Sequence, residues 1–150
     1  MTLGPRLRWS IAAAASLAAL LAARCDTVDL GEPPAGVNAC RPGQQFFIEQ
    51  VWPNVLAKDY GGKHCYDSRC HDAGSGRQLV LTPPTSAAAI PFPPDWQAIY
   101  TSAAEQMQCS NVRASELLTR ASGLRTHGGG RLFDPNGPEA TLLQMWVSQP

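Results

Sequence analysis

The sequence has no excess of charge of either sign and no run of basic residues. Its 150 residues include twelve Lys and Arg and twelve Asp and Glu, which gives a net charge of zero at pH 7. Domains that bind nucleic acid usually carry a basic face or stripe. We therefore expect no nucleic acid among the partners of this protein.

Several catalytic patterns are also missing. No Gly-rich loop is followed by the Lys-Ser or Lys-Thr pair of a phosphate-binding loop. No Ser-His-Asp arrangement can be argued for, and no paired carboxylates occur at an informative spacing. Since no substrate-binding constellation is visible, the sequence favours a protein that is not an enzyme.

The longest apolar run is too short to favour a stable membrane span. It extends from Ile11 to Ala23 and follows the basic residues Arg6 and Arg8. A membrane-spanning helix needs about 20 apolar residues, whereas the apolar region of a signal peptide is shorter and follows basic residues. We interpret residues 1–24 as a signal peptide, with a buried helix as the alternative, and expect the chain to be exported.

The apolar run ends in Leu20-Leu21-Ala22-Ala23-Arg24-Cys25, which resembles the lipobox of bacterial lipoproteins. The resemblance implies that Cys25 is acylated and anchors the protein to a lipid bilayer of the bacterial cell envelope, on the periplasmic side or at the outer membrane. Arg24 departs from the pattern, because a small residue is expected there. Cleavage after Ala23 without lipidation, which gives a protein secreted to the periplasm, is the alternative.

A spacer and one domain follow. Residues 25–43 contain Pro33-Pro34 and several glycines without usable periodicity, so they are predicted to be a lipoprotein tether. Residues 44–150 form the predicted domain. The chain is 44% apolar, which is enough for a core, and its thirteen Pro and thirteen Gly predict long loops.

The most informative stretch runs from Cys65 to His71. It has two cysteines, Cys65 and Cys70, with four residues between them and His71 directly after the second. Two cysteines followed by a histidine can attach a haem through thioether bonds and ligate its iron, although the common motif has two intervening residues. This pattern predicts haem c on Cys65 and Cys70, with His71 as the proximal iron ligand.

Two other interpretations of this stretch remain open. Cys65 and Cys70 can form disulfides with each other or with Cys40 and Cys109, or they can form a zinc site together with a neighbouring histidine. A haem-free domain stabilised by disulfides, with a structural or interaction role, explains the cysteine spacing without strain. If haem is attached, Cys40 and Cys109 are left over and can pair with each other.

Hydrophobic periodicity predicts an all-α domain with long loops rich in Pro and Gly. Helices are predicted over 44–58, with a kink at Pro53, and over 95–108. A short helix is expected after Ser115, and a last helix begins at Pro138.

The order of these features resembles the cytochrome c-like domains of bacterial lipoproteins, especially those of the planctomycetal and myxobacterial type. The resemblance covers residues 44–148. Its most specific parts are Cys70-His71, Ser115-x-Leu117-Leu118 with the following His127-Gly128-Gly129, and Trp146. It implies an all-helical fold in which the first and last helices pack together, with haem c in a crevice and electron transfer to a redox partner protein that remains unknown.

The distal iron ligand is not specified by the resemblance, because the Met-Pro-Pro segment that often supplies it is absent. Candidates are His127, Met107 and Met145. We favour His127, which lies in a Gly-rich loop, and expect Met145 to be a core residue. Ligation by two histidines implies a lower reduction potential than ligation by His and Met. An open distal site with a sensor or peroxidase-like role is a weaker third idea.

Overall fold

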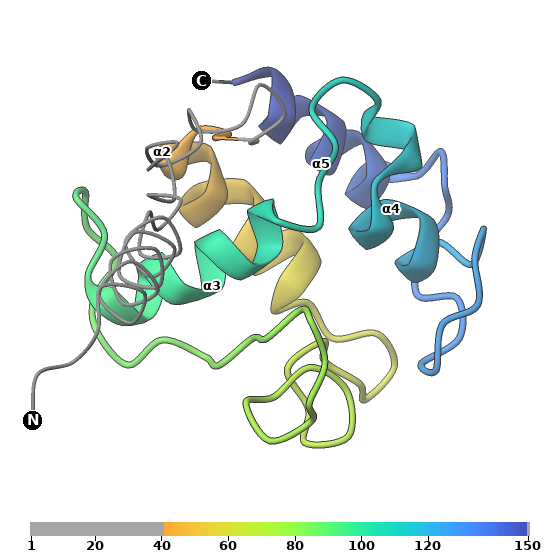
Figure 1. Ribbon diagram of the computed structural model, residues 1–150, viewed down its shortest axis with the longest axis horizontal. Helices are drawn as coiled ribbons and strands as arrows, with labels where there is room; N and C mark the ends of the chain where they lie inside the picture. The colour runs from red at the N-terminus through yellow and green to blue at the C-terminus, as the bar shows by residue number, and fades with distance from the viewer. Residues whose placement is uncertain (1–40, 150) are drawn as a thin grey trace, which may run out of the picture. The chain divides into compact units, whose positions relative to one another are not determined.

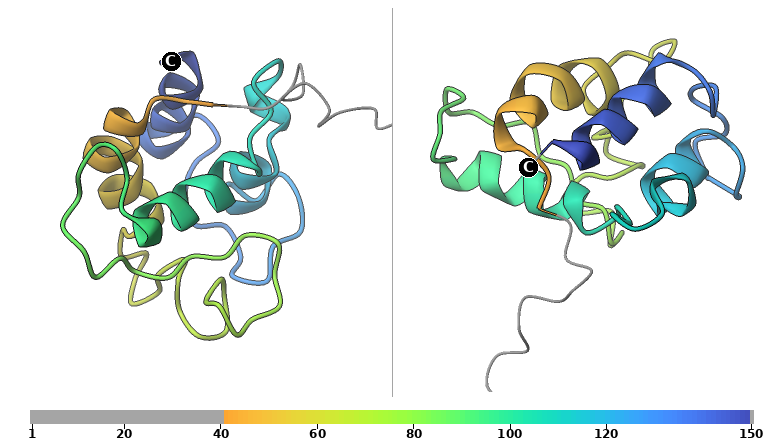
Figure 2. Two further views of the ribbon diagram at one scale, coloured as in Figure 1. Left: turned by 60° about the vertical axis from the view of Figure 1, so that its left-hand side comes forward. Right: turned by 90° about the horizontal axis from the view of Figure 1, so that it is seen from above.

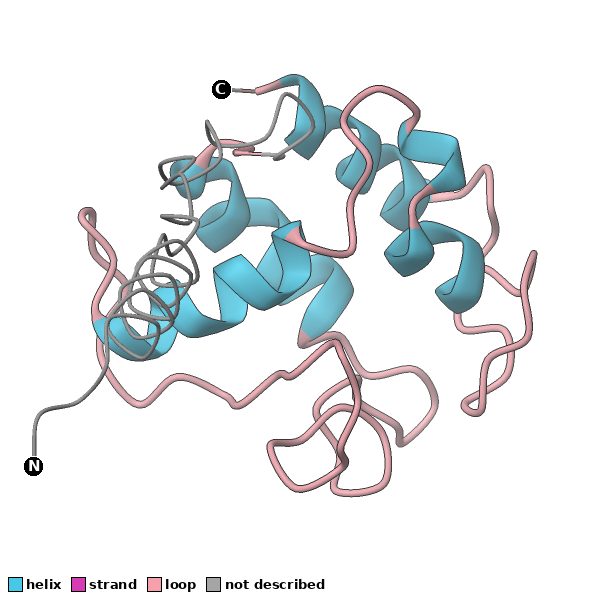
Figure 3. Ribbon diagram, viewed as in Figure 1, coloured by secondary structure: helices cyan, strands magenta, loops and turns pink. Residues whose placement is uncertain are grey.

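The computed structural model describes residues 41–149 (Figure 1). Its helices are α2 (Gln44–Phe46), η1 (Phe47–Leu56), α3 (Pro94–Ala104), η2 (Val112–Ala114), α4 (Glu116–Ala121) and α5 (Pro138–Ser148). No strand occurs among these residues, so the described domain is all-α, as predicted (Figure 3). None of its helices is long and apolar enough to cross a membrane. The predicted signal peptide and most of the tether, with Cys25 and Cys40, lie outside the described residues.

The first predicted helix is present but has an unexpected geometry. α2 leads directly into η1, which is a π-helix rather than an α-helix and contains Pro53. In an α-helix, the ring of this proline would crowd the carbonyl of the residue four positions back. The wider π turn relieves that contact, and the amide of Ala57 closes the helix by donating to Trp52 O at 2.7 Å.

The core is built where the first and last helices meet. The ring of Phe47 in η1 lies 5.2 Å from that of Trp146 in α5 and 5.5 Å from that of Tyr100 in α3, between ring centroids. All three side chains are buried. Figure 2 shows η1 and α5 side by side, and the ring of Tyr100 in α3 also lies 6.0 Å from that of Trp146 in α5. The three helices thus share one aromatic cluster.

Hydrogen bonds from the same cluster hold the start of the described domain. The hydroxyl of Tyr100 donates to Pro42 O at 2.6 Å, and the indole of Trp146 donates to Gly43 O at 3.2 Å. The amide of Gly43 in turn donates to Gln149 O. Each buried polar tip of an aromatic side chain therefore finds a backbone partner, as burial requires.

A long loop, residues 57–93, joins η1 to α3 and is hydrogen-bonded to a carboxylate at the start of α3. Asp95, a residue type that often caps helices, begins the predicted helix 95–108, but α3 begins one residue earlier, at Pro94. Asp95 instead accepts hydrogen bonds from the backbone amides of Thr85 and Ser86 and from the hydroxyl of Ser86. These bonds hold the pKa of the Asp95 carboxyl well below its usual range. Asp95 therefore anchors the Pro-rich part of the loop to α3.

The two methionine candidates differ in burial. Met107 is buried, whereas Met145 is 43% exposed, so the expectation that Met145 belongs to the core is wrong. Helix α5 presents Ala140, Leu143 and Trp146 to the core, and Met145 falls outside that stripe.

Replacing Trp146 by Ala should destabilise the domain by about 3–5 kcal/mol, because the change removes a fully buried indole and leaves a cavity. Urea unfolding followed by circular dichroism measures the difference. Met145→Ala, one residue away but exposed, is the matched control and should change the unfolding free energy by less than about 0.5 kcal/mol. Equal effects of the two substitutions would contradict the role given to the aromatic cluster.

Candidate functional site

Two histidines from different loops lie close together. His71 belongs to the loop 57–93, and His127 belongs to the loop 122–137 between α4 and α5. Their ring centroids are 6.0 Å apart, and their ring planes are inclined by only 11°. In Figure 1 the yellow-green loop lies at the bottom of the view and the blue loop to its right, below α4. The fold therefore brings together the predicted proximal ligand and the favoured distal candidate.

Each of these histidines is oriented by a backbone carbonyl. His71 Nδ1 lies 3.0 Å from Leu79 O, and His127 Nδ1 lies 3.0 Å from Gly130 O. A carbonyl oxygen only accepts hydrogen bonds, so Nδ1 must carry the proton in both rings. In the neutral imidazole, Nε2 then keeps its lone pair. Histidines that bind metals usually have this second hydrogen bond, which sets the tautomer and the ring orientation.

The segment after the Cys-His stretch holds His71 in place. The amide of Leu81 donates to His71 O at 2.6 Å, and the side chains of Leu79 and Leu81 are buried in the core. The amide between them, Val80 N, donates to Ser102 Oγ on α3 at 2.7 Å. His71 is thus tied to a segment that is itself fixed to the helical core.

The environment of His71 favours its neutral form. Burial lowers the pKa of the imidazole, and the nearby His127 and Arg77 lower it further, against the opposing effect of the Leu79 carbonyl. Only a neutral imidazole has a nitrogen lone pair available for a metal ion. His71 is therefore ready to act as a ligand at neutral pH.

Cys65 and Cys70 are both free thiols. The residues between them are taken up by two successive turns, in which Asp67 N donates to His64 O and Cys70 N donates to Asp67 O. Two consecutive turns shorten the path between the cysteines compared with an extended chain. The four-residue spacing is accommodated in this way.

The thiol of Cys65 is directed into the domain. Burial raises its pKa to about 12, with further contributions from Cys70 and Asp67. Its sulfur lies 4.0 Å from the carbonyl oxygen of Val55, at the end of η1. Since Cys70 is among the groups that shift this pKa, the two sulfurs act on one another electrostatically. The two cysteines are thus within electrostatic reach of each other, and His71 follows Cys70 directly in the chain.

The other predicted site residues lie elsewhere. Cys109 is disulfide-bonded, and Cys40, the partner considered for it, is outside the described residues. His64 stacks on Tyr66 with ring centroids 4.9 Å apart and lies 3.6 Å from the Asp67 carboxylate, so it does not join the His71–His127 pair. Sequence reasoning missed the carbonyls of Leu79 and Gly130, for which no sequence signal exists.

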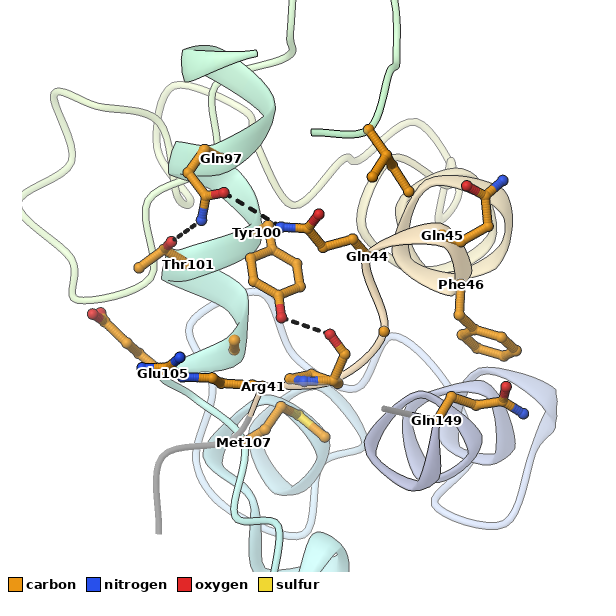
Figure 4. A pocket seen from close by; sticks show the side chains of 14 residues that line it. Arg41, Gln44, Gln45, Phe46, Gln97, Tyr100, Thr101, Glu105, Met107 and Gln149 are labelled. Atoms are coloured by element: carbon orange, nitrogen blue, oxygen red, sulfur yellow. Dashed lines mark hydrogen bonds between the residues drawn. The ribbon is translucent and has the colours of Figure 1, made fainter. Parts of the chain in front are cut away.

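A cavity of about 900 Å³ lies at a different place, between α2 and α3 (Figure 4). Met107 and Tyr100 are among its lining residues, and Gln44 faces Gln97 across it. None of Cys65, Cys70, His71 and His127 lines it. Met107, the second choice for the distal ligand, thus lines a cavity that is separate from the candidate site.

No group of three or more His, Cys, Asp or Glu side chains able to hold a metal ion comes together within residues 41–149. A structural zinc site needs four such ligands. Cys65, Cys70, His71 and His127 are residue types that could ligate zinc, but no three of them converge on one point in the described part of the chain.

Comparison of the chain with known protein families, curated proteins and solved structures found no match. Any functional assignment therefore depends on the residues and their geometry.

In protein produced without haem, Cys65 should react slowly with iodoacetamide at pH 8. Its raised pKa leaves little thiolate in the folded state, so alkylation should be at least about tenfold slower than in urea. Peptide mass spectrometry measures the rate, which should keep rising above pH 9. In Cys70→Ala most of the difference in rate between folded and unfolded protein should persist, because burial is the main cause of the raised Cys65 pKa. Equal rates in folded and unfolded protein would contradict the buried position.

Proposed function

We propose that this protein is an exported c-type haem protein that transfers electrons. In this proposal Cys65 and Cys70 hold the haem covalently, and His71 and His127 are the axial iron ligands. The observation that carries it is the neighbouring pair of nearly parallel imidazoles, each with Nδ1 on a carbonyl and Nε2 left without a hydrogen bond to a described residue.

The spacing of the two rings fits a shared metal ion. Two imidazoles that bind one ion from opposite sides, with metal–nitrogen distances of about 2.0 Å, place their ring centres roughly 6 Å apart. The observed separation is 6.0 Å. Tetrahedral ligation of zinc would draw the two rings closer together and would require two further ligands. The pair therefore supports axial ligation of haem iron better than a zinc site.

The cysteines support the same proposal. Thioether attachment requires two thiols that are not engaged in disulfides, and both Cys65 and Cys70 are free. The haem-free alternative, in which these residues stabilise the fold through disulfides, loses support for the same reason. The packing of η1 against α5 through Phe47 and Trp146 agrees with the arrangement that the cytochrome c-like resemblance implies.

The residues that hold the haem would also set its reduction potential. Haem iron, when bound, supplies a one-electron change of oxidation state, while the protein sets ligands, burial and hydrogen bonds. Donation from each Nδ1–H to a carbonyl raises the basicity of the ligating nitrogen. Two such imidazoles stabilise the oxidised iron, so we propose a reduction potential below that of a His–Met protein.

The proposal places electron transfer in the bacterial cell envelope. It includes attachment to the lipid bilayer through Cys25 and a redox partner protein of unknown identity. The basic and apolar pattern of residues 1–25 supports export, and the disulfide at Cys109 agrees with an oxidising compartment.

Covalent haem can be tested directly. Protein exported in a host with c-type haem maturation machinery should give the α-band of haem c in an alkaline pyridine haemochrome spectrum after denaturation. Because the thioether bonds need both sulfurs, Cys65→Ala and Cys70→Ala should each abolish or change this band. A colourless wild-type protein would contradict the proposal.

The distal ligand has a separate test. His127→Ala should convert the reduced haem from a low-spin form to one that binds carbon monoxide, because one axial position loses its imidazole. His64→Ala is the matched control, since His64 lies close to the attachment stretch but outside the His71–His127 pair. Visible and electron paramagnetic resonance spectra report the spin state. A low-spin spectrum retained in His127→Ala would exclude His127 and return Met107 to consideration.

A further inference from the structure

His127 lies in a loop that has no regular secondary structure, so its position depends on individual hydrogen bonds. Within the loop, the amide of Gly130 donates to His127 O at 2.9 Å and closes a turn. Gly130 has φ +77°, which favours glycine at this position. This turn orients the imidazole locally, but it does not fix the loop relative to the rest of the domain.

Helix α4 supplies the bonds that fix the loop. The amide of Arg125 donates to Thr119 O at 2.9 Å, and the amide of Leu132 donates to Ala121 O at 2.8 Å. Between these two backbone bonds, the side chain of Arg120 donates from Nη1 to Thr126 O at 3.0 Å. Thr126 directly precedes His127, so this side-chain bond holds the chain beside the ligand candidate.

The guanidinium of Arg120 is itself oriented by a carboxylate. Its Nε donates to Glu116 Oε2 at 2.5 Å, and the other oxygen of Glu116 pairs with Arg125. Glu116 therefore joins the helix to the loop through two arginines. A planar guanidinium that is held at Nε keeps Nη1 in a fixed direction, which a lysine ammonium would not do.

We propose that Arg120, oriented by Glu116, is the positioning residue that keeps His127 beside His71. This inference rests on the proposed function. With haem bound, the network would hold His127 in place as an iron ligand and would so limit the access of small neutral ligands to the site. Arg120 does not touch the reacting group and acts only through the Thr126 carbonyl.

The effect is expected to be local. The Arg120 side chain is 48% exposed, and the backbone bonds at Thr119 and Ala121 do not involve its side chain. Removal of the guanidinium should leave α4 and the core in place. It should loosen only the segment between the two backbone bonds, where His127 lies.

The experiment measures carbon monoxide binding to the reduced holoprotein by stopped flow, together with the low-spin fraction in visible spectra. Arg120→Ala should raise the binding rate by roughly tenfold, the size expected for loss of one charge-assisted hydrogen bond. Glu116→Gln should change the rate in the same direction. Arg113→Ala is the matched control, because this exposed arginine on η2 makes no side-chain hydrogen bond or ion pair with any described residue.

The outcomes separate the two proposals. A wild-type protein without haem c overturns the proposed function and this inference with it. A low-spin wild type in which Arg120→Ala binds carbon monoxide at the rate of Arg113→Ala overturns this inference alone. If Arg120→Ala does not fold, judged by circular dichroism, Glu116→Gln decides the matter: a rate equal to that of Arg113→Ala overturns the inference, and a faster rate supports it.

Discussion

The contact between Phe47 and Trp146 is the interaction on which the rest of the described domain depends. It joins the first helix to the last, and Tyr100 adds the third helix to the same cluster. Further buried aliphatic side chains, among them Val51, Ile99 and Leu143, pack around this cluster and complete the core. The loop of His71 runs from η1 to α3 and the loop of His127 ends on α5, so the aromatic cluster contributes to where the two loops meet.

The candidate site is made entirely of loop residues, and it is ordered by hydrogen bonds rather than by regular secondary structure. His71 is held through Leu79 and Leu81, whose side chains are anchored in the core. His127 is held through Gly130 and through Arg120 of α4. Each imidazole therefore has an orienting carbonyl and a connection to a helix. A preorganised pair of ligands requires that both the orientation of each ring and the position of its loop are fixed in this way.

Part of the fold could be predicted from local pattern. The last helix begins at Pro138, as expected, because proline suits the first turn of a helix. The π geometry around Pro53 and the role of Asp95 could not be predicted, since both depend on how the chain packs after the helices form. Ser115 is at the expected N-cap position, yet its hydroxyl accepts from Gln108 N instead of capping α4.

The sequence by itself determined the helical class of the domain and the order Cys65, Cys70, His71, because periodicity and spacing are local properties of the chain. It also indicated His127 as a candidate through the glycines that follow. Only the tertiary structure decided that His71 and His127 stand 6.0 Å apart with nearly parallel rings. The physical reason is that their loops are distant in the chain. They meet only when η1, α3 and α5 close around Phe47.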